Sequence, residues 1–140
     1  EIPFLEAATL GTRKVMENHS HIGIVITSDG SFTEFRRDEY EEVEDKKYVH
    51  TIYKETFATS PADMVNLKIA FQERFGETVE EVEFTGLVTN MCVISNVAVF
   101  QARFPNAQMI VDPTLCDSFD KGLHKAAIDV MRGMQVHIVE

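Results

Sequence analysis

The sequence predicts an α/β protein in three layers, with a mostly parallel sheet covered by helices. Two observations lead to this fold class. Short apolar runs that favour strands alternate with longer segments of helical periodicity along the 140 residues. The predicted strands are apolar on both faces, which is typical of parallel strands buried between helices. A chain of this length predicts one domain, residues 1–140.

In the first half of the chain the pattern predicts helix, strand, strand and helix. Residues 4–18 have helical periodicity, and residues 22–27 form an apolar run typical of a strand. Residues 48–53 are rich in β-branched and aromatic side chains and favour a second strand. Ser60 predicts a helix N-cap, because a proline follows it and Asp63 lies three positions on, near the positive helix end.

The second half continues the alternation to the end of the chain. Strands are predicted at residues 82–85, 108–111 and 136–139. Helices are predicted between them, at the unusually apolar residues 90–103 and at residues 120–132. The elements therefore follow one another as strand, helix, strand, helix and strand, the order of a parallel sheet.

One charged block interrupts the pattern, at residues 34–47 (EFRRDEYEEVEDKK). Such a block is most often a solvated loop or helix, and the functional alternative is a lid over a site. His124 and His137 are expected at surface positions of their helix and strand.

Composition limits the classes of partner. The formal net charge is −10, from 13 Lys+Arg against 23 Asp+Glu, which argues against a nucleic-acid partner. No apolar run reaches the roughly 20 residues of a membrane span, and no signal-peptide pattern occurs, so we expect a cytoplasmic protein without a membrane partner. Cys92 and Cys116 have no metal-site spacing, and free thiols are favoured over a structural disulfide.

Cys92 lies where chemistry is expected in such a fold. Ligands of open parallel sheets bind beyond the carboxyl ends of the strands. Residues 86–93 (GLVTNMCV) lie there, and Cys92 falls in the first turn of the following helix. The N–H groups of that turn favour a thiolate and can hold an oxyanion. The alternative is that Cys92 is a small buried residue of an apolar helix, and position alone leaves both open.

The segment GLVTNMCV resembles the signature of the isochorismatase/nicotinamidase-like cysteine hydrolases. Residues 110–118 resemble the next strand and loop of that family, and residues 53–57 resemble its lysine-containing segment. The resemblance implies that Cys92 attacks a substrate carbonyl and that Lys54 activates the thiol. It further implies a cis peptide between Leu87 and Val88. The oxyanion hole would consist of the backbone N–H groups of Val88 and Cys92. The residues expected to contact the substrate are Phe57, Leu87 and Asn90.

This resemblance implies a hydrolase that cleaves a C–N amide-type bond of a small molecule through a thioester on Cys92. The alternative is a non-catalytic homologue that acts as a binding or assembly module. A third hypothesis, an oxidant sensor, rests on Cys92 and Cys116 alone. Cys116 itself is expected to be a small packed residue, or else a second thiol near the pocket mouth. Because members of the family often associate, we also expect a homo-oligomer.

Two departures from the family pattern are visible. The family has an Asp-x-Gln strand at the centre of its sheet, and residues 1–21 contain no aspartate. We therefore expect that the chain lacks this N-terminal strand and that the general base comes from outside it. Metal-holding members have Asp-x-His where Asp29 is followed by Gly30 and Ser31. Asp29 is better interpreted as a turn residue, so neither a metal nor a cofactor is expected.

Overall fold

The computed structural model describes residues 23–29, 39–44, 47–51, 56–75 and 79–140. The chain divides into two compact units. The first combines Glu1–Ser31 with Val79–Glu140, and the second is Phe32–Thr78. The predicted helix at residues 4–18 lies outside the described residues.

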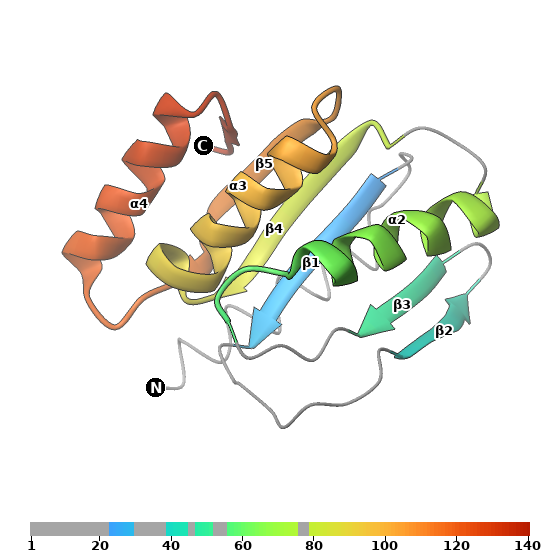
Figure 1. Ribbon diagram of the computed structural model, residues 1–140. Helices are drawn as coiled ribbons and strands as arrows, with labels where there is room; N and C mark the ends of the chain where they lie inside the picture. The colour runs from blue at the N-terminus through green and yellow to red at the C-terminus, as the bar shows by residue number, and fades with distance from the viewer. Residues whose placement is uncertain (1–22, 30–38, 45–46, 52–55, 76–78) are drawn as a thin grey trace. The chain divides into compact units, whose positions relative to one another are not determined.

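The first unit contains a four-stranded parallel sheet in the order β1-β4-β5-β6 (Figure 1). Its strands are β1 (Gly23–Asp29), β4 (Glu81–Leu87), β5 (Gln108–Asp117) and β6 (His137–Ile138). A short π-helical turn, η1 (Thr89–Val93), leads into α3 (Ile94–Arg103), and α4 (Lys121–Gly133) follows β5. The predicted α/β class and the parallel sheet are therefore confirmed.

The ends of two strands differ from the prediction. β1 continues through Asp29, so this residue ends a strand and is not in a turn. β5 continues from Val111 to Asp117, across a shift in register opposite Thr85. Asp112 accepts hydrogen bonds from the N–H and the hydroxyl of Thr114, at 3.0 and 2.7 Å. This local turn lets a polar, proline-containing segment remain in the sheet, which the apolar pattern could not predict.

The strand β1 occupies the edge beside β4, where the two pair in parallel over seven residues of β1. It corresponds to the strand predicted at residues 22–27. The expectation that the chain lacks a first central strand stays a prediction.

Aromatic packing joins α3 to the sheet. The rings of Phe84 on β4 and Phe100 on α3 meet edge to face with centroids 5.8 Å apart. Phe104 stacks on Phe100 at 6.1 Å. Around them, Val82, Val97 and other apolar side chains have almost no exposure. Figure 1 shows α3 lying along the strands of this sheet, which explains why its sequence is so apolar.

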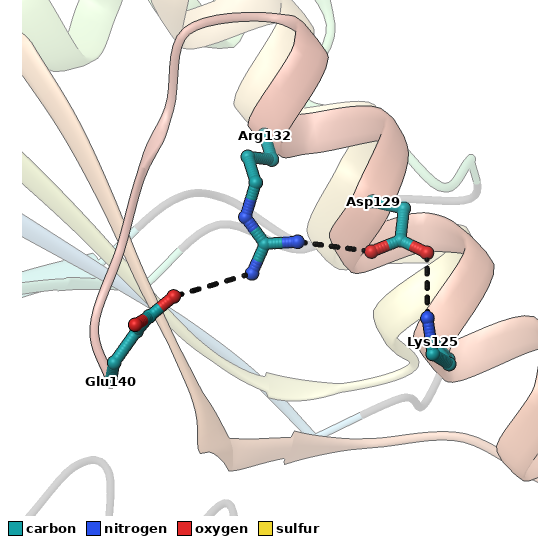
Figure 2. A network of polar contacts seen from close by, with 4 residues as sticks. All are labelled: Lys125, Asp129, Arg132 and Glu140. Atoms are coloured by element: carbon teal, nitrogen blue, oxygen red, sulfur yellow. Dashed lines mark hydrogen bonds and ion pairs between the residues drawn. The ribbon is translucent and has the colours of Figure 1, made fainter.

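Helix α4 has a capped start and a charged outer surface. Asp120 Oδ1 accepts a hydrogen bond from Leu123 N at 3.0 Å. Asp129 accepts from Lys125 at 2.9 Å and from Arg132 at 3.0 Å, and Arg132 also lies 3.8 Å from Glu140 (Figure 2). The hydrogen bond and charge of Lys125, and then the charge of Arg132, lower the pKa of Asp129. Because these groups are exposed, the network adds little to stability.

The second unit contains a β-hairpin and one helix. β2 (Glu39–Glu44) pairs antiparallel with β3 (Lys47–Thr51), and α2 is Pro61–Phe75. The expectation of a loop or helix at residues 34–47 is therefore wrong for 39–44. The backbone of this charged segment pairs with β3 from Glu39 opposite Thr51 to Glu44 opposite Lys47, with a shift in register between Glu42 and Glu44. β3 is also part of this hairpin and not of the parallel sheet.

The start of α2 agrees with its prediction. Asp63 N donates to Ser60 Oγ at 3.2 Å, and Ser60 Oγ donates to Asp63 Oδ2 at 3.0 Å. The serine hydroxyl thus satisfies an N–H group that would have no partner within the helix.

Replacing Phe100 with alanine should strongly destabilise the protein. The ring is 1% exposed, and removing a buried aromatic ring costs about 3–5 kcal/mol of unfolding free energy. Phe119→Ala is the matched control, because Phe119 is 79% exposed and surface changes usually stay within about 0.5 kcal/mol. Urea unfolding measures both. Equal losses in the two variants would contradict the packing described for α3.

The buried thiol of Cys116 should make the stability of the protein depend on pH. The thiol is buried, as expected for a packed residue, and lies 3.9 Å from the Phe84 carbonyl oxygen. Burial, and secondarily the charge of Asp112, raises the pKa of Cys116 from 9.0 to about 12. Between these values the unfolded chain has released the proton while the folded chain keeps it. The thiol's contribution to stability is therefore complete below about pH 9 and is lost as pH rises towards about 12.

The protein should therefore lose more stability between about pH 8 and about pH 10 than a Cys116→Ser variant, by about 1 kcal/mol. Serine does not titrate in this range and retains a hydroxyl for the Phe84 carbonyl. Urea unfolding under reducing conditions at the two pH values measures the difference. Identical losses would show that Cys116 titrates normally in the fold.

Candidate functional site

The carboxyl edge of the parallel sheet places three strand ends side by side. Leu87 ends β4, with Asp29 of β1 in register on one side and Asp117 of β5 on the other. The turn to η1 begins directly after Leu87. This is the edge at which open parallel sheets bind their ligands.

The turn between β4 and η1 has an unusual backbone. Gly86 has a φ of 103°, which a side chain would disfavour. The peptide between Leu87 and Val88 is cis, as the sequence resemblance implied. The Val88 carbonyl accepts from Met91 N at 3.0 Å and from Val93 N at 3.1 Å. The chain therefore reverses sharply and enters η1 at Thr89, with its first turn wider than an α-helix.

Two consecutive side chains of η1 are joined to the segment around α4. The Thr89 hydroxyl lies 2.7 Å from His124 Nδ1, 35 positions further along the chain. Ser118 Oγ donates to Asn90 Oδ1 at 2.6 Å and accepts from Asp120 N at 3.3 Å. The starts of η1 and α4 are thus held together by side-chain hydrogen bonds.

The structure brings together four of the predicted site residues within this turn. Leu87, Val88 and Cys92 are buried, at 0, 4 and 2% exposure, and Asn90 is half-buried. The Cys92 carbonyl accepts from Asn96 Nδ2 at 3.0 Å, within the helix. The roles predicted for these residues remain predictions.

The positions of the other two predicted site residues relative to this turn stay untested. Phe57 belongs to the second unit and is 45% exposed. Lys54 lies outside the described residues. The structure therefore does not test the predicted pairing of Lys54 with Cys92.

His124 is less exposed than its sequence predicted. It was expected at the surface, but it is half-buried and bonded to Thr89. Its position in the sequence does indicate that it faces the core side of α4. The buried Ala127, Ile128 and Met131 follow it at three, four and seven positions, which is the spacing of one helix face. His137 is exposed, as expected.

Among the described residues, no group of three or more histidine, cysteine or acidic side chains could hold a metal ion. None of the described helices is long and apolar enough to cross a membrane. The absence of a metal and the cytoplasmic location stay predictions.

Comparison with solved structures concerns the fold. The nicotinamidase from Bacillus subtilis matches with a TM-score of 0.51 at 17% identity, over 63% of this chain and 45% of that one. A structure described as an isochorismatase hydrolase from Oleispira antarctica matches with a TM-score of 0.50 at 13% identity, over 63% and 48%. The resemblance found in the sequence is therefore correct for the fold.

Comparison of sequences leads to a different family. The model of the Stage IV sporulation protein A ATPase domain matches residues 1–91. Curated proteins called Stage IV sporulation protein A are 53% identical in Bacillus subtilis (strain 168) and 56% identical in Bacillus anthracis. Each match covers 45 residues, which are 32% of this chain and 9% of the relative. The chain thus matches only a small part of these relatives' length.

The predicted function, a cysteine hydrolase of the amidase or nicotinamidase type, is wrong, because these sequence relatives overturn it. So is its alternative of a non-catalytic isochorismatase-like module. The error has a physical reason: the GLVTNMCV segment specifies a strand-to-helix turn, and a fold can carry unrelated chemistries at such a turn. The matched family and the similar structures are all described as enzymes. Since the family model covers residues 1–91, more than half of the chain, the chain belongs to the family of the Stage IV sporulation protein A ATPase domain.

Proposed function

We propose that this chain takes part in binding and hydrolysing ATP, as part of a sporulation protein. The observation that carries the proposal is the match of residues 1–91 to the ATPase domain of Stage IV sporulation protein A. The curated relatives have the same protein name, over an aligned region that is 9% of their length. The activity of the whole protein is therefore part of the proposal.

The turn between β4 and η1 suits the phosphate groups of ATP. Backbone N–H groups and the positive end of the dipole attract anions to the start of a helix. η1 continues directly into α3 and has no acidic residue in its first turn. At the start of η1, the backbone N–H groups of Val88 and Thr89 would here donate to phosphate oxygens.

No segment of the 140 residues follows the Gly-x4-Gly-Lys-Ser/Thr pattern of a phosphate-binding loop. Among the described residues, the turn at Gly86 has the related layout of a strand, a glycine and a helix start. The proposal therefore assigns phosphate contact to backbone groups and not to a loop lysine.

ATP reacts as a complex with Mg²⁺, which neutralises charge on the phosphates during transfer. Mg²⁺ prefers oxygen ligands, and carboxylate residues end the strands on both sides of Leu87, at Asp29 and Asp117. Asp117 Oδ1 already accepts from Ser118 N at 2.8 Å, which holds that carboxylate at the sheet edge. Asp117 would thus offer this edge a carboxylate of the kind that Mg²⁺ prefers.

Asn90→Asp should weaken MgATP binding about tenfold or more, which is about 1.4 kcal/mol or more. The new carboxylate would repel the phosphates at the first turn of η1. It would keep the hydrogen bond from Ser118 Oγ and interact favourably with the helix dipole, so stability should not fall. Calorimetric titration with MgATP measures affinity, phosphate release measures hydrolysis, and urea unfolding measures stability.

Asn106→Asp is the matched control. It adds the same charge at an exposed turn between α3 and β5, at the opposite edge of the sheet. Equal affinities in the two variants would reject the site at η1 while leaving ATP binding intact. If the unaltered chain neither binds nor hydrolyses MgATP, the proposed function itself is wrong.

A further inference from the structure

The outer side of α4 carries a line of exposed apolar and small residues. Leu123, Ala126, Val130 and Gly133 follow one another at three, four and three positions, and Phe119 lies four positions before Leu123. Residues at this spacing lie along one side of a helix. The exposed fractions are 79% for Phe119, 51% for Leu123 and 55% for Val130, and Ala126 and Gly133 are also exposed. These five residues make up the α4 stripe.

The α4 stripe is separate from the side of the helix that packs on the core. Ala127, Ile128 and Met131 make up that buried side. Single exposed apolar residues are normal, but a row of them along a helix marks an interaction surface. Spacings of three and four positions are typical of helices that pair along their length. The second apolar side of α4 therefore indicates that another helix packs on it.

The sizes of the residues along the α4 stripe are complementary to a second copy that runs in the opposite direction. Phe119, the largest, lies at one end, and Gly133 lies at the other. Among the described residues, nothing outside its own helix lies within 4 Å of a Cβ added at Gly133. A two-fold axis at Ala126, the middle of the stripe, places Phe119 of each copy over Gly133 of the other. The same axis pairs Leu123 with Val130 and brings the two Ala126 residues together, which lets the helices approach closely.

The charges beside the α4 stripe also favour a second copy. With a formal net charge of −10, two copies of the chain repel each other in most orientations. Helix α4 and its N-cap, in contrast, carry three basic side chains and two acidic ones, namely Lys121, Lys125, Arg132, Asp120 and Asp129. The axis at the middle of the stripe places Lys125 of each copy level with Asp129 of the other, whereas a parallel pairing would place like charges together. Exposed ion pairs add little affinity, but they select the orientation.

We propose that α4 is the interface of a two-fold symmetric dimer, in which the α4 stripes of two copies pack antiparallel. The helix has 13 residues, so it is about 20 Å long and the contact is small. The dimer should therefore be weak and reversible. The α4 stripe lies beyond residues 1–91, which the family model matches, and it contains no residue of the proposed phosphate site. The dimer is thus independent of the proposed function.

Sedimentation of the unaltered chain without nucleotide, between about 1 μM and about 1 mM, should show an equilibrium of monomer and dimer. Leu123→Lys and Val130→Glu each place a charge opposite an apolar side chain, and each should weaken the dimer about tenfold or more. Both positions are more than half exposed, so both variants should fold, which urea unfolding checks. Val65→Lys is the matched control, because it adds a charge at a 46% exposed valine of α2 and should leave association unchanged.

A mixture of the two variants tests the antiparallel arrangement itself. In the mixed dimer the lysine of the first variant faces the glutamate of the second, so the mixture should associate about tenfold or more tightly than either variant alone. No gain on mixing would overturn the antiparallel pairing. If either variant folds poorly, Ala126→Lys places two like charges across the axis and should abolish the dimer. An unaltered chain that stays monomeric over the whole concentration range would show that a different protein covers the stripe, and the proposal would be wrong.

Discussion

Strand β4 pairs with β1 on one side and with β5 on the other, and each part of the candidate site depends on this central position. Because Phe84 packs against Phe100, the strand also fixes α3 above it. The end of β4 then determines where η1 begins, and Gly86 has there the positive φ that a side chain would disfavour. A buried strand with neighbours on both sides cannot slip by one residue without moving every apolar side chain to the other face. The register of β4 therefore fixes the residue at which the chain leaves the sheet for η1.

The sequence allowed most of this framework to be predicted, because burial leaves periodic patterns. The strands at β4 and β5 and the helices α3 and α4 were all visible as apolar runs or helical spacing. Elements that depend on strand pairing or on a side-chain turn were less visible. The charged β2 pairs with β3 in a hairpin, and β5 extends past Asp112, where that side chain accepts from Thr114. Neither feature leaves a periodic pattern in its own segment.

The sequence predicted where the candidate site lies, but it did not predict which reaction the site supports. The segment from Gly86 to Cys92 contains the glycine, the cis peptide and the helix start, all of which the structure has. These features describe how a backbone enters a helix beyond a parallel strand, and any anion can use them. The hydrogen bond between Thr89 and His124 was not predictable in the same way. It joins residues 35 positions apart, and each looked ordinary in its own element.

A polyanion bound by this chain would meet an acidic protein, with a formal net charge of −10. Long-range repulsion would slow its approach at low ionic strength, but salt screens exposed charges beyond about 8 Å at physiological ionic strength. Binding would then depend on groups that act at short range. Backbone N–H groups and the helix dipole are such groups, because their effect falls off within the first turn.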